Sequence, residues 1–189
     1  MSDHERIRAA LARRAPLQQQ PQQEVRWAAV ALVLAPGGKG EPDALLIRRA
    51  RHERDPWSGH VALPGGRHEP DDPDLFATAR RETREEIGLA LDAGTCLGQL
   101  DDLHPTHGLR PPIVVRPYVF GLVGRPRLRL NREIAAELWT PLEVLRRERV
   151  VSRIVVAGRE REVPSIPLGE GVLWGMTLRI LDGFLERVG

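Results

Sequence analysis

Cysteine is almost absent from this sequence, and long apolar runs are missing altogether. The single cysteine, Cys96, excludes a disulfide within the chain and is typical of proteins in a reducing cytoplasm. No stretch approaches the roughly 20 consecutive apolar residues of a membrane-spanning helix. Residues 1–6 are mostly polar and have no apolar signal region behind them. We therefore expect a cytoplasmic protein with no membrane partner.

Lysine is also scarce, since Lys39 is the only one and the other 27 of the 28 basic residues are arginines. The net charge is only +2, the arginines are interleaved with 26 acidic residues, and aromatic residues make up 4%. Because no basic stripe with aromatic side chains is present, we expect no nucleic-acid partner. Guanidinium groups suit phosphate recognition, although we expect most of these arginines to pair with surface acids.

The length of 189 residues fits one domain with a good core, preceded by a short extension. Residues 4–15 place Ile7 and Leu11 on one side of a candidate helix. The glutamine-rich stretch 18–23 is typical of a linker or a loose arm. We expect residues 1–24 to form a peripheral helix and arm that could cover a neighbouring subunit, and residues 25–189 to form the main domain.

Strand patterns prevail in the main domain. Apolar and β-branched runs predict strands at residues 25–34, 44–47, 96–100, 113–123 and 138–140, with a hairpin at 151–163. Helical patterns are expected at residues 73–87, 131–134, 141–147 and 173–188, and the last of these should pack across the sheet. This order predicts an α/β (α+β) fold, namely an α/β/α sandwich with a central mixed β-sheet.

The most informative stretch is a short helix that carries three glutamates. Asp72, before a proline, is a good N-cap, and Gly88 can end the helix. Glu82, Glu85 and Glu86 stand at i, i+3 and i+4, so their side chains share one helix face. Carboxylates so close repel one another, and a divalent cation such as Mg²⁺ or Mn²⁺ removes this penalty. The alternative is a solvated acidic face paired with neighbouring arginines.

This stretch resembles the Nudix box, whose pattern is G-x5-E-x7-R-E-U-x-E-E-x-G-U with U an aliphatic residue. Residues 81–89 match the second half, with Thr83 in place of an aliphatic residue, and Gly66 matches the start. The first half is one residue longer than the pattern and carries aspartate in place of glutamate. The partner of Arg81 is therefore either Asp72 or Asp74.

The resemblance implies a central mixed sheet between helices over about residues 25–188, and hydrolysis of a nucleoside diphosphate linked to another moiety. It implies Mg²⁺ or Mn²⁺ as cofactor, a nucleotide-type small molecule as substrate, and a homodimer as the family-based expectation. The implied site comprises Glu82, Glu85, Glu86 and the Gly65 carbonyl as metal ligands, Glu82, Glu85 or Glu133 as general base, and Arg81 with Asp72 as a structural brace.

The segment before the box resembles the signature of coenzyme A diphosphatases, L-L-T-x-R-[SA]-x3-R-x3-G-x3-F-P-G-G. Matching residues are Arg49, Ala50, Arg54, Gly59 and residues 64–66. Ile47 and Leu63 depart from the signature, and the gap before Gly59 is one residue longer. The resemblance implies coenzyme A or a derivative as substrate, with Arg49 and Arg54 binding phosphate. ADP-ribose, NADH, a dinucleotide and a nucleoside triphosphate stay open as alternatives.

Two other classes of function fit the same fold. An isopentenyl diphosphate isomerase uses an active-site cysteine, but Cys96 follows the acidic helix in a predicted strand. A non-catalytic nucleotide-sensing module would lose the acids, yet all three glutamates are present. We interpret His60 as a structural residue, and His104 and His107 as part of a substrate-side loop.

Overall fold

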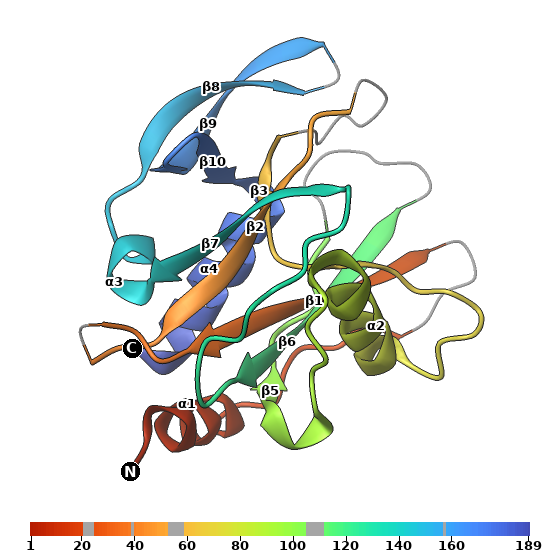
Figure 1. The fold of residues 1–189 in the computed structure, drawn as a ribbon, viewed down its shortest axis with the longest axis vertical. Coiled ribbons are helices and arrows are strands. Elements are labelled where there is room, and N and C mark those ends of the chain that lie inside the picture. Colours follow the sequence, from red (N-terminus) through yellow and green to blue (C-terminus); the bar gives the residue numbers. More distant parts are fainter. Residues whose placement is uncertain (21–24, 39, 53–58, 105–111, 157) are drawn as a thin grey trace.

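The computed structural model of the protein describes residues 1–20, 25–38, 40–52, 59–104, 112–156 and 158–189. The main strands of these residues are β1 (Arg26–Ala35), β2 (Asp43–Arg49), β3 (Val61–Ala62), β4 (Gly65–Arg67), β5 (Cys96–Gln99), β6 (Ile113–Gly121) and β7 (Ile134–Pro141). Within the described residues they form one seven-stranded sheet in the order β3-β2-β1-β6-β5, with β4 also paired to β1 and β7 to β2 (Figure 1). Strands β1 and β6 run parallel and the other pairs antiparallel, which confirms the predicted mixed sheet.

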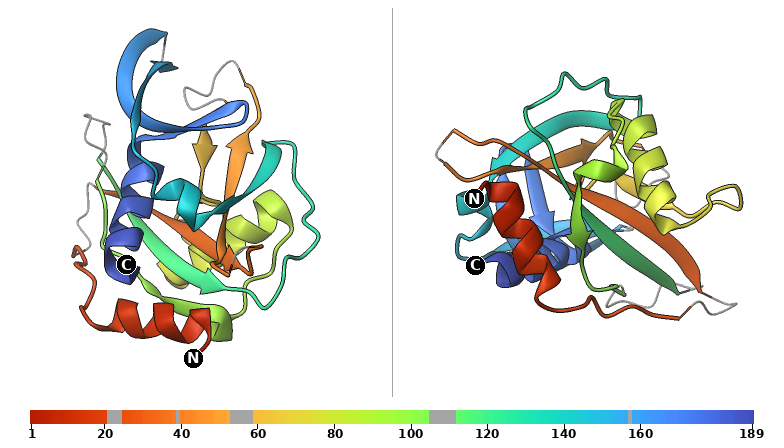
Figure 2. Two further views of the ribbon diagram at one scale, coloured as in Figure 1. Left: turned by 90° about the vertical axis from the view of Figure 1, so that its left-hand side faces the viewer. Right: turned by 90° about the horizontal axis from the view of Figure 1, so that it is seen from below.

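Both faces of β1 are covered, which explains its nearly continuous apolar sequence. The odd-numbered residues from 29 to 33 pack in a cluster with residues of helix α2 (Leu75–Ile87). Leu32 and Leu34 belong to a second cluster with residues of helix α4 (Gly175–Val188). Figures 1 and 2 show the two helices on opposite faces of the sheet. The predicted α/β/α sandwich is confirmed.

A smaller antiparallel sheet follows the short helix α3 (Leu142–Leu145). It consists of β8 (Val150–Val156), β9 (Arg159–Leu168) and β10 (Gly171–Trp174), so the predicted hairpin is confirmed and extends further than expected. The last helix begins at Gly175 rather than at residue 173, because residues 171–174 pair with β9. None of the helices in the described residues is long and apolar enough to cross a bilayer.

The short helix expected at residues 131–134 is wrong. Ile134 begins β7, and the residues before it form a turn. Strand β7 pairs with β2 from Arg49 to Asp43, a contact between residues nearly a hundred positions apart in sequence. Residues 134–141 form a strand because they pair with β2, and the sequence around residue 134 alone gives no sign of this distant partner.

The N-terminal helix α1 (Asp3–Ala12) is part of the core. Ser2 and Glu5 form a reciprocal capping box at its start. Ile7 and Leu11 are 7% and 4% exposed and belong to the same hydrophobic cluster as α4. Figure 2 shows α1 lying against the end of the sheet, with the N-terminus near the C-terminus. The helix therefore packs on its own chain.

The segment after α1 is attached by hydrogen bonds, whereas the sequence predicted a loose arm. Asp101 accepts hydrogen bonds from the backbone N–H of Leu17 (2.7 Å) and from Arg14 (2.6 Å). Asp102 accepts one from the backbone N–H of Gln19 (2.7 Å). The arm is therefore fixed to the loop after β5, and residues 21–24 lie outside the described part of the chain.

Replacing Leu11 with alanine is expected to lower the free energy of unfolding by about 2–4 kcal/mol, because a buried methyl-rich side chain is lost and a cavity remains. Equilibrium urea unfolding measures this change. Leu17→Ala is the matched control, since the Leu17 side chain is exposed (66%) and should cost less than about 0.5 kcal/mol. Equal losses in the two variants would show that α1 contributes nothing to the core.

Candidate active site

Two consecutive glycines bring β4 against the acidic helix. Gly65 has φ +148°, and a Cβ atom there would lie 2.3 Å from the Ala29 carbonyl oxygen. A Cβ atom on Gly66 would lie within 2.6 Å of the Glu82 carboxylate. The backbone contact at position 65 requires glycine, whereas a larger residue at position 66 would have to displace the end of the Glu82 side chain.

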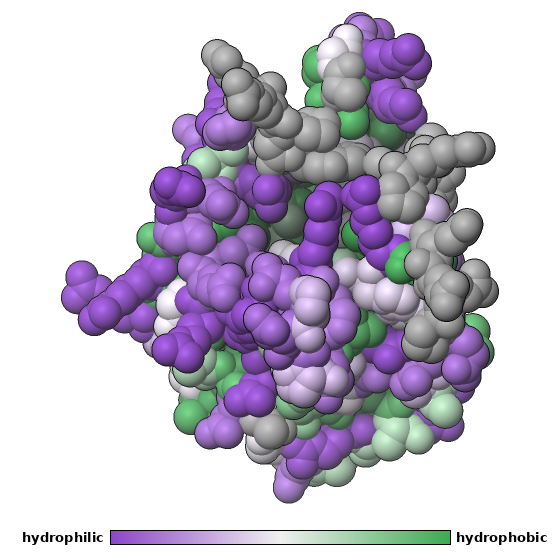
Figure 3. All heavy atoms as spheres, turned by 90° about the vertical axis from the view of Figure 1, so that its right-hand side faces the viewer, coloured by the Kyte–Doolittle hydropathy of each residue, from purple (hydrophilic) through white to green (hydrophobic). Residues whose placement is uncertain are grey.

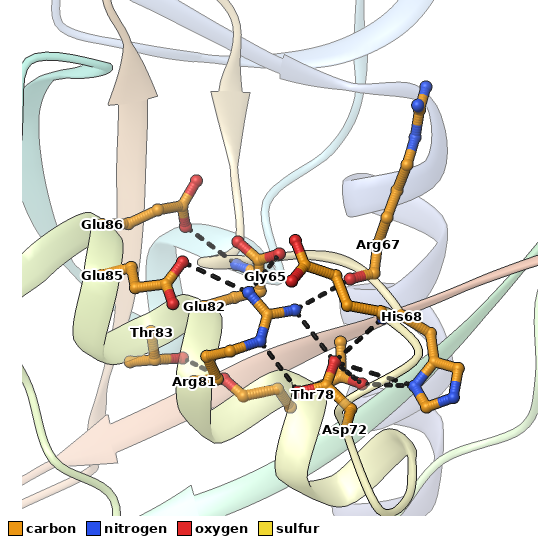
Figure 4. A network of polar contacts seen from close by, with 12 residues as sticks. Gly65, Arg67, His68, Asp72, Thr78, Arg81, Glu82, Thr83, Glu85 and Glu86 are labelled. Carbon is orange, nitrogen blue, oxygen red and sulfur yellow. Dashed lines mark hydrogen bonds and ion pairs between the residues drawn. The ribbon is translucent and has the colours of Figure 1, made fainter.

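Arg81 is the centre of the polar network beside this turn (Figure 4). Its guanidinium donates two hydrogen bonds to Asp72, at 2.8 and 2.9 Å, and one to the Arg67 carbonyl, at 3.0 Å. It also donates to Glu82 (3.1 Å) and Glu85 (3.2 Å). One arginine thus connects the acidic loop, β4 and two of the three helix glutamates.

Asp72 is bound to Arg81 and does not cap the helix, so the expected N-cap is wrong. The cap is Asp74, which accepts a hydrogen bond from the Ala77 N–H (2.7 Å). The Asp72 carboxylate also accepts from the hydroxyl of Thr78 (2.9 Å), a fully buried side chain that the sequence analysis did not single out. At the other end of α2, Gly88 adopts the left-handed conformation (φ +70°), as predicted.

Burial dominates the electrostatics of two of the glutamates. Glu86 is 4% exposed, and its carboxylate accepts a hydrogen bond from the Gly65 N–H (2.9 Å). Desolvation raises the pKa of Glu86 to about 7, and the negative charges of Glu82 and Glu133 add to this rise. Desolvation also raises the pKa of Glu82. Both carboxylates are therefore destabilised in their ionised form.

These carboxylates fit a divalent cation. Positive charge near Glu82 and Glu86 would offset the cost of their burial, and an all-oxygen donor set suits Mg²⁺ or Mn²⁺. As the side chains lie, no three carboxylate, imidazole or thiol groups in the described residues are gathered as a ready cation site. Glu85 is directed to Arg81 and Glu86 to Gly65 (Figure 4). Binding would therefore require these side chains to turn toward the ion.

The remaining candidate residues lie around this helix. Arg49 ends β2, and its positive charge opposes the rise in the pKa of Glu86. Glu133 is exposed in the turn before β7 and also influences Glu86. The structure therefore brings Arg49, Glu86 and Glu133 to one region, whereas Arg54 lies outside the described residues. Figure 3 shows that hydrophilic side chains prevail on the face that carries α2.

His60 and Cys96 have local contacts. The ring of His60 packs edge-on against Trp174, with 5.2 Å between centroids. Cys96 lies on β5, at the opposite edge of the central sheet from β3, and its thiol donates to the Gly98 carbonyl (3.7 Å). Burial raises the pKa of this thiol, which makes it a poor nucleophile. His104 is exposed and its backbone carbonyl accepts a hydrogen bond from Arg179 (2.7 Å), whereas His107 lies outside the described residues.

Acidification is expected to remove the stabilisation that Asp72 provides. The hydrogen bonds from Arg81 hold the pKa of the Asp72 carboxyl well below its usual range. The folded state therefore binds fewer protons than the unfolded state, so this stabilisation is complete above the unfolded pKa of about 4 and is lost as the pH falls toward the folded pKa. The difference in unfolding free energy between the unmodified protein and Asp72→Asn should shrink from pH 6 to pH 2. Urea unfolding at each pH measures it.

The exposed neighbour Asp71 supplies the control for this profile. Asp71→Asn removes a carboxylate at the exposed surface and should change the unfolding free energy at pH 6 by less than about 0.5 kcal/mol. A gap between the unmodified protein and Asp72→Asn that stays constant down to pH 2 would contradict the role given to the Arg81 hydrogen bonds.

Comparisons with known proteins agree with this fold and this helix. The NUDIX domain family model matches residues 24–157. NudL of Yersinia pestis, an uncharacterised Nudix hydrolase, is 31% identical over 161 residues, covering 78% of this chain and 73% of NudL. An uncharacterised protein of Schizosaccharomyces pombe is 39% identical over 106 residues, and the match covers 53% of this chain but only 32% of that longer protein.

The fold is shared with solved structures. The NUDIX domain of Shewanella oneidensis NrtR, solved with ADP ribose, superposes with a TM-score of 0.60 over 93% of this chain and 90% of that one, at 18% identity. Because the family model matches well over half of the residues, the chain belongs to the Nudix hydrolases, enzymes that split diphosphate linkages with water.

Proposed function

We propose that this protein is a Mg²⁺- or Mn²⁺-dependent diphosphohydrolase whose substrate is coenzyme A or a close derivative. The observation that carries the proposal is the position of Arg49. It belongs to the segment, residues 45–66, that resembles the coenzyme A diphosphatase signature, and it lies close enough to Glu86 to influence that carboxyl. A signature arginine and one acid of the Nudix box, Glu86, therefore lie within electrostatic reach of each other.

Each residue has a role in this proposal. Glu82, Glu85, Glu86 and the Gly65 carbonyl would hold the cation, and Arg81 with Asp72 would brace the loop that faces it. A bound divalent cation supplies positive charge that neutralises phosphate oxygens and acidifies a water molecule. Glu82, Glu85 and Glu133 are the candidates for the general base that takes a proton from the attacking water.

The substrate part of the proposal rests on arginine chemistry. Cleavage of the diphosphate of coenzyme A would give adenosine 3′,5′-bisphosphate and 4′-phosphopantetheine. The 3′-phosphate adds negative charge, and the planar guanidinium groups of Arg49 and Arg54 can each donate two parallel hydrogen bonds to phosphate oxygens. The hydrophilic face around α2 is compatible with such a highly charged substrate (Figure 3).

A substrate panel tests the proposal. We expect kcat/KM for coenzyme A to exceed the values for ADP-ribose, NADH and a nucleoside triphosphate, measured with Mg²⁺ and with Mn²⁺ and with the products identified. If coenzyme A is the poorest of the four with both metals, the substrate assignment fails. ADP ribose, the ligand in the NrtR complex, or a dinucleotide would then be the leading alternative.

The proposal extends to partners and location. A nucleotide-type small molecule is the expected partner, without nucleic acid, and the protein is proposed to be a cytoplasmic homodimer. The dimer is tested by light scattering on the eluting protein, where a mass near 21.1 kDa would contradict it. An isomerase is disfavoured by the position and raised pKa of Cys96. A sensing module is disfavoured because the three glutamates are retained, and metal-dependent turnover would exclude it.

A further inference from the structure

The turn at residues 131–133 ties the acidic helix to the end of β2. The backbone N–H of Asn131 donates to the Glu86 carbonyl (2.8 Å), which belongs to the last turn of α2. Carbonyls at a helix C-terminus have no partner within the helix, so an outside donor fixes the turn to α2. The Glu133 carbonyl in turn accepts from the N–H of Ala50, next to Arg49 (2.7 Å).

The side chain of Asn131 stabilises this turn through a hydrogen bond within it. Its Oδ1 accepts a hydrogen bond from the Glu133 N–H (2.8 Å), the arrangement in which an asparagine side chain replaces a backbone carbonyl in a turn. The N–H and the C=O of Glu133 are thus both bonded, one to Asn131 and the other to Ala50. The backbone from which the Glu133 side chain extends is therefore held at a fixed position relative to both α2 and β2.

The three candidate bases differ in their surroundings. Glu82 and Glu85 both accept hydrogen bonds from Arg81, and Glu82 is also in contact with Gly66. Glu133 is exposed, and among the described residues its carboxylate makes no hydrogen bond or ion pair. A base must be able to receive a proton from water, so the carboxylate without a cationic partner is the best suited of the three.

We propose that Asn131 is a positioning residue that holds the backbone of Glu133 against the acidic helix, so that the Glu133 carboxylate serves as the general base. This inference rests on the proposed function, because it selects one of the bases named there. It assigns Asn131 a role that acts only through Glu133, and it leaves the metal ligands of α2 unchanged.

A double-mutant cycle tests this dependence. We expect Glu133→Gln to lower kcat at least about a hundredfold, the range for loss of a general base. Asn131→Ala should lower kcat about tenfold with KM changed less than twofold, and Asn131→Asp should keep kcat within about threefold because its carboxylate can accept the same hydrogen bond. In the Glu133→Gln background, Asn131→Ala should cost less than a further twofold, since no base remains to be positioned.

A binding measurement separates positioning from damage to the helix. The dissociation constant for Mn²⁺, measured by titration calorimetry on each full-length variant, should stay within twofold of the unmodified value in Asn131→Ala. Arg132→Ala is the control from the same turn, because Arg132 is exposed and its side chain makes no hydrogen bond or ion pair with the described residues, and it should leave kcat and Mn²⁺ binding unchanged.

Three outcomes would overturn the inference. Losses that multiply in the double variant would show that Asn131 does not act through Glu133. A tenfold weakening of Mn²⁺ binding in Asn131→Ala would show damage to α2. Near-normal kcat in Glu133→Gln would show that Glu133 is not the general base, while the proposed diphosphohydrolase activity would stand. The proposed function itself would be refuted if the unmodified protein cleaved no substrate of the panel.

Discussion

Replacing Glu86 with glutamine is expected to reduce kcat at least about a hundredfold while the fold is retained. Glutamine has the same shape, so the 2.9 Å contact with the Gly65 N–H can be kept through its amide oxygen. The negative charge is lost, however, and with it one ligand for a hard cation. A loss of several kcal/mol of transition-state stabilisation corresponds to at least this rate factor.

Three measurements check this result. Steady-state kinetics on the best substrate gives kcat, titration calorimetry gives Mn²⁺ affinity, and circular dichroism with thermal melting reports the fold. Glu186→Gln on α4 is the matched control, because Glu186 is an exposed helical glutamate whose carboxylate makes no hydrogen bond or ion pair with the described residues. A folded Glu86→Gln protein with near-normal turnover would sink the assignment of Glu86 as a metal ligand.

Replacing Arg81 with alanine is expected to lower the free energy of unfolding by about 3 kcal/mol and also to reduce the rate. The Asp72 side chain is 5% exposed, and Arg81 is its cationic partner. Removing one member of a buried ion pair leaves an uncompensated charge, which is typically more costly than never having the pair. The hydrogen bond to the Arg67 carbonyl is lost at the same time, so the acidic loop should become looser.

Two further variants identify the source of this loss. Arg84→Ala removes an exposed arginine from the same helix and should change the unfolding free energy by less than about 0.5 kcal/mol. Adding Asp72→Asn to Arg81→Ala should restore part of the stability, because the unpaired buried charge is gone. A double variant no more stable than Arg81→Ala would mean that the buried carboxylate is not what destabilises the protein.

The sequence predicted the acidic helix well because its signals are local. The Gly88 stop and the i, i+3, i+4 spacing of the glutamates depend on neighbours along the chain, and the structure has both. The choice between Asp72 and Asp74 could not be made locally, since Arg81 lies one helix turn or more beyond either residue. Only the folded loop shows that Asp72 meets the guanidinium and that Asp74 is left to cap α2.

The turn at residues 131–133 shows the same limit. An asparagine followed by charged residues is a common helix start, and the sequence was interpreted in that way. In the structure, the Asn131 N–H instead donates a hydrogen bond to the Glu86 carbonyl at the end of α2, and strand β7 begins at Ile134. Both partners, Glu86 and β2, are 45 or more positions away in the sequence, so the feature that places Glu133 beside the site has no local signal.

The packing of α1 against α4 has a consequence for synthesis in the cell. Ile7 and Leu11 share a hydrophobic cluster with Leu181 and Phe184, so α1 can pack against α4 only after residues 175–188 have been made. At about 5–20 residues per second, synthesis of the residues between the two helices takes roughly 8–32 s. During that time the apolar face of α1 has no partner on α4, and nascent chains shortened before α4 should be more readily cleaved by protease within α1 than the complete chain.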